Sequence, residues 1–266
     1  MSTQAARFIG SIPQIYDEHL GPHIFEDYAA DLARRVANLG PKHVLELAAG
    51  TGILTRNLRD VLSRNCEILA SDLNAPMLDI AQKKFAIGER VKFEPVDATE
   101  LQFNDASFDV VACQFGVMFF PDKDRSYREV FRILKSGGNY VFSVWDSWAE
   151  NPFAEIAHRV VEQFFPDDPP GFYKVPFGYH DKSEIIAAVL QAGFDDVKAE
   201  HVPLSATIVS ASSFAKGLVF GNPLYEEIVT RGGDPNAVLE AVTEAIDTEL
   251  GSAMPLRALV VHASKS

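Results

Sequence analysis

The chain has 266 residues, 47% of them hydrophobic and 19 of them phenylalanine, so it can bury the core of one large domain or two small ones. This composition excludes a disordered or fibrous protein, and no apolar run approaches the roughly 18–20 residues that span a bilayer. The N-terminal sequence MSTQAARFIGSIPQIYDE is unlike a secretory signal. Since Cys66 and Cys113 are two isolated cysteines in apolar stretches, we expect a cytoplasmic protein without a disulfide framework.

Negative charge is concentrated in the second half of the chain. Residues 1–145 carry 16 Lys and Arg against 19 Asp and Glu, a net charge of −3, and residues 146–266 carry 8 against 18, a net charge of −10. Such a surface repels phosphate backbones and anionic lipid headgroups. We therefore expect a small-molecule partner, and neither nucleic acid nor a membrane surface.

Helix and strand patterns alternate between about residue 22 and residue 145. Apolar spacing predicts a helix from Gly21-Pro22 to Leu39 and another from about 122 to 134. Short buried strands are predicted at 43–47, 67–72, 91–95, 108–114 and 139–145. Strands that alternate with helices in this way indicate a parallel sheet with right-handed crossovers.

The alternation stops after Trp145. Residues 146–180 contain five prolines and many aromatic residues, which predicts an insertion, helical at about 153–165, that lies over the edge of the sheet. The pair Asp181 and Glu184 resembles a capping box at the start of a helix that ends near Gly193. Further helices are predicted at 210–220 and 235–250, and further strands at 197–204 and 256–263.

The most informative segment is Val44-Leu-Glu-Leu-Ala-Ala-Gly-Thr-Gly52, where a buried strand runs into a turn of small residues and then a helix. Small residues let a ligand lie against the backbone, and the helix N-terminus favours an anionic group. A tight turn without any ligand explains this segment equally well when it is taken alone.

Three more predicted strands end in residues that could contact a ligand. Asp72 follows Gly50 by 22 residues, a spacing suited to a carboxylate that accepts hydrogen bonds from ribose hydroxyls. Asp97 with Ala98, and Gln114 with Phe115, end the third and fourth strands. Because open sheets bind ligands at the carboxyl ends of their parallel strands, the four positions together predict a nucleoside site.

Two families of nucleoside-binding enzymes compete for this pattern. A dinucleotide fingerprint requires Gly-x-Gly-x-x-Gly, but Thr55 occupies the third glycine position, which disfavours a nicotinamide-dependent oxidoreductase. The motif of an acidic residue, small residues and glycines resembles that of class I S-adenosylmethionine-dependent methyltransferases, in particular the branch of the ubiquinone/menaquinone C-methyltransferases. The resemblance covers about residues 40–145, and the predicted strands at 197–204 and 256–263 would be the antiparallel sixth and seventh strands of that fold.

The resemblance implies an α/β fold, with a Rossmann-like sheet of seven strands, mostly parallel with the last strand antiparallel, and helices on both faces. We expect one methyltransferase domain over residues 1–266. Its parts are an N-terminal lid segment (1–25), a cofactor-binding core (40–145), a substrate-cap insertion (146–180), and C-terminal helices with the closing strands (181–266). The cofactor would be S-adenosyl-L-methionine.

The resemblance also implies roles for individual residues at the methionine end of the cofactor. Glu46 would order the turn near the amino group, and Ala48, Gly50 and Gly52 would approach the methionine portion, with Ala48 standing where the family has glycine. Tyr16 resembles a tyrosine that closes over this end, although a core aromatic of an amphipathic helix is an alternative. At the nucleoside and the reactive side, the implied residues are Asp72 for the ribose, Leu73 and Met77 for packing, Asp97 and Ala98 for adenine, and Gln114 and Phe115 facing the methyl group.

Methyl transfer depends chiefly on alignment, and a dedicated base is optional. His180 is the first candidate for a base, against the alternative of an exposed residue before the Asp181 cap, and His19 and His23 are weaker candidates; no metal-ligand spacing occurs. An apolar acceptor pocket is predicted from Trp145, Trp148, Phe153, Phe172, Tyr173 and Phe177. We expect a small-molecule methyltransferase, with a non-catalytic cofactor-binding protein as an alternative, and mobile lids at 1–25 and 146–180.

Overall fold

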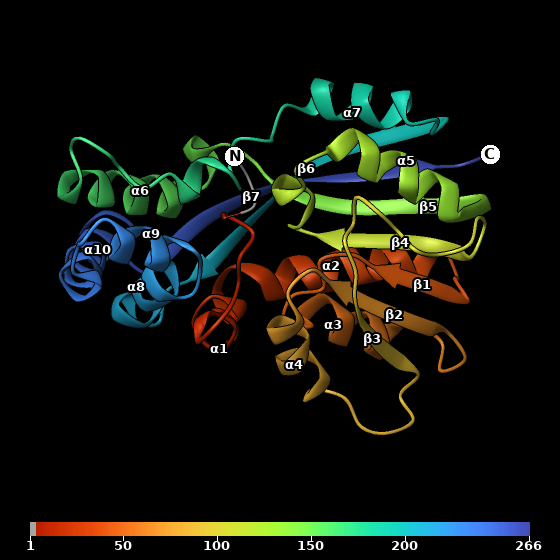
Figure 1. The fold of residues 1–266 in the computed structure, drawn as a ribbon, viewed down its shortest axis with the longest axis horizontal. Helices are drawn as coiled ribbons and strands as arrows, with labels where there is room; N and C mark the ends of the chain where they lie inside the picture. Colours follow the sequence, from red (N-terminus) through yellow and green to blue (C-terminus); the bar gives the residue numbers. More distant parts are fainter. Residues whose placement is uncertain (1–3) are drawn as a thin grey trace.

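The computed structural model describes residues 4–266 and is built around a seven-stranded sheet of order β3-β2-β1-β4-β5-β7-β6 (Figure 1). The first five strands are parallel to one another, and β7 runs antiparallel to both β5 and β6. The predicted fold class is confirmed. The strands are β1 His43–Glu46, β2 Glu67–Asp72, β3 Val91–Pro95, β4 Phe108–Gln114, β5 Leu134–Trp145, β6 Asp196–Thr207 and β7 Ala253–Ser264.

Burial along the strands follows their place in the sheet. In the central strands β1 and β4, Val44, Leu45 and Val111 are fully buried, as expected for parallel strands that are covered on both faces. The outer strand β3 instead exposes Lys92 and Glu94. Charged residues on an edge strand discourage pairing with a further strand.

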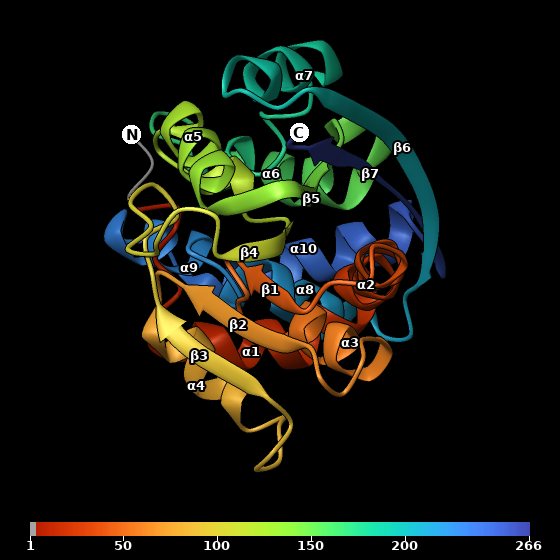
Figure 2. The same cartoon turned by 90° about the vertical axis from the view of Figure 1, so that its right-hand side faces the viewer.

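Helices cover both faces of the sheet (Figures 1 and 2). The helices α2 Glu26–Asn38, α3 Ile53–Val61 and α4 Ala75–Gln82 lie on one side, and α5 Lys123–Ile133 and α7 Lys182–Gln191 lie on the other. Asp181 caps α7 by accepting hydrogen bonds from the Ser183 and Glu184 amides, so the predicted start of this helix is confirmed. No helix among residues 4–266 is long and apolar enough to cross a bilayer.

One predicted boundary is wrong, and a helix before residue 21 was not predicted. The helix predicted from residue 21 to 39 is preceded by the separate helix α1 Ile12–His19 and opens with a π-helical turn over Gly21–Phe25. Strand β5 begins at Leu134, immediately after α5, because its early residues pair with β4 around a register shift between Phe108 and Val110. The first three residues of the predicted N-terminal lid lie outside the described residues.

A helical cap lies beyond the carboxyl ends of the parallel strands (Figure 1). It consists of α6 Pro152–Phe164 together with α8 Ala211–Phe220, α9 Leu224–Thr230 and α10 Pro235–Glu249, the last three inserted between β6 and β7. Helix α6 packs against α10. The prediction that residues 146–180 lie over the edge of the sheet is therefore wrong, since this segment closes the end of the sheet. Helix α9 was not predicted.

Asp146 joins the cap to the sheet. Directly after β5, its buried carboxylate accepts hydrogen bonds from the Ser147 amide (2.6 Å) and Arg257 Nε (2.6 Å), and lies 2.8 Å from His201 Nδ1. Burial by itself raises the pKa of this carboxyl, but the bonds from Ser147 and Arg257 hold the pKa below its ordinary value. Asn151, at the start of α6, bonds to the backbone of both Asp146 and Arg257. The cap is thus anchored where β5 and β7 meet.

Replacing this carboxylate should weaken the whole fold. Asp146→Asn removes the charge that satisfies Arg257 and His201, and we expect a loss of about 2 kcal/mol, the scale of hydrogen bonds to charged groups. A chain of this size should then unfold roughly 4–8 °C lower in a thermal melt. The control is Asp196→Asn. This change removes an exposed ion pair between Asp196 and Lys198, both on β6, and should leave the melting temperature unchanged. Equal melting temperatures for Asp146→Asn and the control would contradict this role.

Candidate functional site

Two cavities adjoin at the carboxyl ends of the parallel strands. The first, called the strand-end cavity, has an open volume of about 950 Å³ and lies over β1, β2 and β4. The second, called the aromatic cavity, has an open volume of about 490 Å³ and lies between the sheet and the cap. Four residues line both cavities and form the partition between them: Phe8, Tyr16, Phe115 and Phe119.

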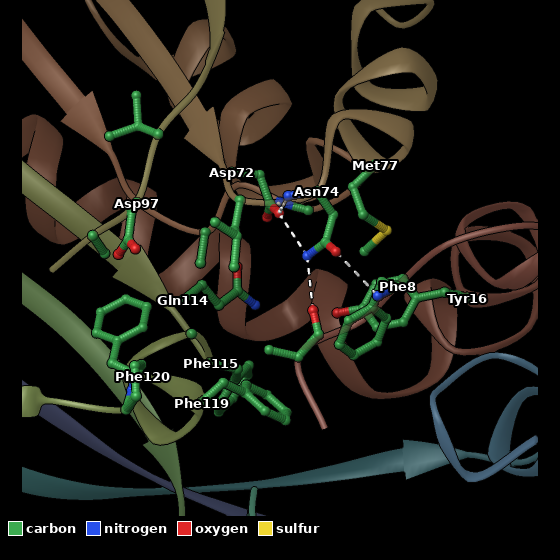
Figure 3. A pocket seen from close by; sticks show the side chains of 18 residues that line it. Phe8, Tyr16, Asp72, Asn74, Met77, Asp97, Gln114, Phe115, Phe119 and Phe120 are labelled. Atoms are coloured by element: carbon green, nitrogen blue, oxygen red, sulfur yellow. Dashed lines mark hydrogen bonds between the residues drawn. The ribbon is translucent and has the colours of Figure 1, made fainter. Parts of the chain in front are cut away.

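Most of the predicted site residues come together in the strand-end cavity (Figure 3). They are brought there by the parallel topology, which places the ends of β2 and β4 on either side of the turn after β1. The predicted residues that line this cavity are Tyr16, Ala48, Gly50, Asp72, Leu73, Met77, Asp97, Ala98, Gln114 and Phe115.

The Asp72 carboxylate is held in place by backbone amides. Oδ2 accepts from the Gly50 amide (2.9 Å), and Oδ1 accepts from the Asn74 amide (2.8 Å). Burial raises the pKa of Asp72, and the two amide hydrogen bonds oppose that rise. Because each carboxylate oxygen has two lone pairs, Oδ2 can still accept a hydrogen bond from a ligand. Oδ1 also accepts from Asn74 Nδ2 at 3.3 Å, and a ligand donor could replace this longer bond.

The turn after β1 places its backbone in the left-handed region. Ala48 and Gly50 have φ of 51° and 55°. A Cβ at Gly50 would meet only Met77 Cε, at 3.5 Å, so the cavity is open beside this residue. A Cβ at Gly116 would lie 2.4 Å from that of Ala48, so the methyl group of Ala48 is accommodated by glycine on the facing loop.

Gly52 lies apart from the other residues of the motif that were predicted to approach the cofactor. It is absent from the lining of the strand-end cavity, and a Cβ there would lie 2.8 Å from Ala81 Cβ on α4. With a φ of 81°, Gly52 instead permits the close approach of α3 and α4. The second glycine of the motif therefore serves helix packing.

Glu46 lies deeper, beneath the turn. It lines a small space next to the strand-end cavity, together with Tyr16, Gly50, Thr51 and Gln114. Burial raises the pKa of the Glu46 carboxyl to about 8; the nearby Thr55 hydroxyl opposes this rise, and the charge of Asp72 adds to it. Its Oε2 atom has no hydrogen-bond partner among the described residues. A buried oxygen of this kind is suited to a ligand that brings a donor.

The remaining predicted residues of the strand-end cavity lie near its rim. Asp97 Oδ1 accepts from the amide and the hydroxyl of Thr99, both at 2.7 Å, which leaves Oδ2 for a ligand. Leu73 exposes 61% of its surface at the cavity, an unusual position for a large apolar side chain. Covering Leu73 with an apolar ligand face would remove that surface from water.

The aromatic cavity confirms most of the predicted apolar pocket. Trp145, Phe153, Phe172, Tyr173 and Phe177 line it. The sixth predicted residue is wrongly placed, because Trp148 packs on His158, with ring centroids 4.8 Å apart, and does not line the cavity. Among the described residues that line the aromatic cavity, none is charged at neutral pH.

The structure places the candidate base His180 outside both cavities. Its Nδ1 lies 2.9 Å from the Phe177 carbonyl oxygen, next to the Asp181 cap, so the alternative interpretation of His180 accounts for its position. His19 bonds to the Ser213 hydroxyl, and His23 packs on Phe214. Neither lines the strand-end cavity or the aromatic cavity, and no cluster of metal-ligating side chains occurs within residues 4–266.

Several lining residues were missed from the sequence. Ala6 and Phe8 come from a segment without helical or strand periodicity, and Leu218 and Asn222 come from α8 and the loop after it. Asn74 lines the strand-end cavity although its position at the start of α4 suggests only a helix cap. Phe119 and Phe120 also line the strand-end cavity, and these two could have been predicted because they closely follow the end of β4.

Comparison with known proteins identifies the family of this chain. Residues 17–166, more than half of the chain, match the model of the ubiE/COQ5 methyltransferase family. The demethylmenaquinone methyltransferase of Clavibacter sepedonicus is 35% identical over 191 residues, which cover 66% of this chain and 74% of that protein. The Thermus thermophilus protein of the same name is 40% identical over 114 residues, which cover 42% of this chain and 50% of that protein.

Among solved structures, a Haemonchus contortus phosphoethanolamine N-methyltransferase 2 in complex with S-adenosyl-L-methionine has the same fold. Its TM-score is 0.59 at 16% identity, over 95% of this chain and 56% of that chain. The chain spans only about half the length of several curated relatives that it matches. The motif around Glu46 and Gly50, the strand order and the family match agree, and the chain belongs to the ubiE/COQ5 methyltransferase family of class I S-adenosylmethionine-dependent methyltransferases.

Proposed function

We propose that this protein transfers a methyl group from S-adenosylmethionine to a small, uncharged acceptor that carries a flat apolar ring. The observation that carries the proposal is the partition of Phe8, Tyr16, Phe115 and Phe119, on which a carboxylate-bearing cavity and an aromatic cavity meet. A cofactor on one side and an acceptor on the other would have their reacting atoms at this shared wall. The names of the relatives, demethylmenaquinone methyltransferases, support a quinone-type ring as the acceptor.

The residues of the strand-end cavity fit this cofactor. Asp72 would accept from both ribose hydroxyls, and Asp97 Oδ2 would accept from the adenine amino group. Met77 and the exposed Leu73 would pack on the nucleoside. The unpartnered oxygen of Glu46 would face the ammonium group of the methionine portion.

The chain itself would contribute alignment and exclusion of water. S-adenosylmethionine, when bound, supplies an electrophilic methyl group on a sulfonium. The sulfur departs as a neutral thioether, so this leaving group needs no proton. Holding the acceptor atom in line with that methyl group converts binding energy into rate. Tyr16 and Phe115 would set this line, since they border both cavities, and the cap would keep water out.

The aromatic cavity selects for an acceptor that needs little help from a base. Its Tyr173 hydroxyl and Asn222 amide both donate to the Leu218 carbonyl oxygen, at 2.8 and 2.9 Å, so these polar groups are already engaged. With no charged side chain in the lining, a charged acceptor would be desolvated without compensation. A neutral, electron-rich ring, such as a phenol or a quinol, fits because it is nucleophilic without carrying a charge into the cavity.

Binding of the cofactor is tested at Asp72. Asp72→Ala removes acceptors for two hydroxyl groups, and we expect the affinity for S-adenosylmethionine to fall at least about tenfold in isothermal titration. Asp79→Ala, an exposed carboxylate on the adjacent helix α4, is the matched control and should bind like the wild type. NAD should give no binding heat with any of the three proteins. Unchanged affinity in Asp72→Ala would contradict the ribose assignment.

The raised pKa of Glu46 predicts a pH-dependent stability. The unfolded chain loses this proton near pH 4.5 and the folded chain near pH 8, so the free energy of unfolding falls as the pH rises through that window. Glu46→Gln cannot ionise. The melting temperature of Glu46→Gln minus that of the wild type should therefore increase between about pH 5 and pH 8 and then stay constant.

The control for this measurement is the cofactor itself. An ammonium group beside Glu46 stabilises the ionised carboxyl, so saturating S-adenosylmethionine should reduce the difference between the two proteins above about pH 7. A difference in melting temperature that is the same at every pH would contradict a raised pKa at Glu46.

The acceptor site is tested by filling the aromatic cavity. Leu218→Phe adds a ring to the lining, and we expect loss of methyl transfer to 1,4-naphthohydroquinone with unchanged affinity for S-adenosylmethionine. The measurement is mass spectrometry of the acceptor with labelled cofactor. Transfer by Leu218→Phe at the wild-type rate would place the acceptor elsewhere, and no turnover of any ring acceptor by the wild type would favour a non-catalytic cofactor-binding protein.

A further inference from the structure

Asn74 does not behave as its position predicts. It occupies the N-cap of α4, where an asparagine side chain normally accepts a hydrogen bond from an amide in the first turn of the helix. No such bond is present, so the first turn of α4 lacks a side-chain cap. Residues that break a local rule in this way are often committed to a functional contact.

The side chain of Asn74 instead contacts the N-terminal segment (Figure 3). Nδ2 donates to the Ala6 carbonyl oxygen (2.9 Å), and Oδ1 accepts from the Phe8 amide (3.2 Å). Both polar atoms of the side-chain amide thus form hydrogen bonds with the backbone on either side of Arg7. A residue of a neighbouring β-strand would make the same pair of hydrogen bonds. Nδ2 also lies 3.3 Å from Asp72 Oδ1, the oxygen that accepts from the Asn74 amide.

The segment held by Asn74 forms part of the site. Ala6 and Phe8 line the strand-end cavity, and Phe8 also lines the aromatic cavity. The Phe8 ring meets those of Tyr16 and Phe119 edge-on, at centroid distances of 5.8 and 6.0 Å. Phe8 therefore packs against two of the other three residues of the partition.

The N-terminal region also makes contacts that lie away from Asp72. Lys84 pairs with Asp17 at the far end of α4, at 2.5 Å. His19 bonds to Ser213 of the cap, at 2.8 Å. The side chain of Asn74 hydrogen-bonds both to Asp72 and to the segment before α1.

We propose that Asn74 is a positioning residue that couples occupation of the ribose site to placement of Phe8 in the partition. This inference rests on the proposed function. A ribose bound to Asp72 fixes the carboxylate against which the Asn74 amide rests, and Asn74 then fixes residues 6–8 over the nucleoside. Because such coupling is reciprocal, releasing the segment must weaken cofactor binding by the same factor as the cofactor orders the segment.

The experiment uses Asn74→Ser, which separates this role from a structural one. Serine is as good an N-cap as asparagine but too short to reach residues 6–8, so α4 should keep or gain stability. Hydrogen exchange of residues 5–20 is followed with and without S-adenosylhomocysteine, and affinity is measured by titration. In the wild type we expect the ligand to slow exchange about tenfold in this segment.

In Asn74→Ser the slowing should be lost and the affinity should fall roughly fivefold or more, as expected for loss of one or two neutral hydrogen bonds. Its melting temperature without ligand should be no lower than that of the wild type. Asn74→Asp, also a preferred N-cap, keeps the acceptor for the Phe8 amide but loses the donor to Ala6, so it should lose part of the slowing; its added charge beside Asp72 should weaken cofactor binding further. The control Asn65→Ser, in an exposed loop, should behave as the wild type.

The outcomes distinguish the two proposals. If the wild type does not bind S-adenosylhomocysteine, the proposed function fails. If the wild type binds and slows exchange, but Asn74→Ser and Asn74→Asp slow it equally, the cofactor assignment stands and the coupling role of Asn74 is overturned.

Discussion

The carboxylate of Asp72 is the group on which the site depends. A buried charge needs hydrogen-bond donors, and the amides of Gly50 and Asn74 supply them from two different segments. One side chain at the end of β2 therefore fixes both the turn after β1 and the start of α4. Asn74 in turn hydrogen-bonds to the N-terminal segment, which lines the same cavity with Ala6 and Phe8.

The two cavities are built by different means. The strand-end cavity is made by backbone turns at the ends of β1, β2 and β4, and all of its strand-end residues lie within the family match of residues 17–166. The aromatic cavity draws Phe172, Tyr173 and Leu218 from beyond that match. Backbone geometry thus shapes the strand-end cavity, whereas side chains of the cap shape the aromatic cavity, the proposed acceptor site, where a member of this family can differ from its relatives.

This division explains which residues could be predicted from the sequence. Asp72, Asp97 and Gln114 were predictable because the ends of parallel strands meet at one edge, whatever the rest of the chain does. Phe8 and Asn74 were not, because their contact joins residues far apart in the sequence, and residues 6–8 have no periodicity. Asn at the start of a helix looks like a cap whether or not it makes the capping bond.

The wrong predictions have equally local causes. Gly52 was assigned to the ligand because a glycine needed for a ligand and a glycine needed beside Ala81 look the same in sequence. Trp148 and His180 belong to an aromatic-rich segment whose composition predicts a pocket but not which side chains enter it. The seven strands and the antiparallel last strand followed from the pattern and the resemblance, whereas α9 is too short for apolar spacing to indicate a helix.

The most direct test of the account is a crystal structure of the protein with S-adenosylhomocysteine. The account predicts both ribose hydroxyls at about 3 Å from the Asp72 carboxylate, a distance typical of hydrogen bonds. It also predicts the sulfur atom pointing at the partition between Tyr16 and Phe115, with the aromatic cavity open on the other side. A ligand bound with its ribose away from Asp72, or with its sulfur facing away from the partition, would contradict the account.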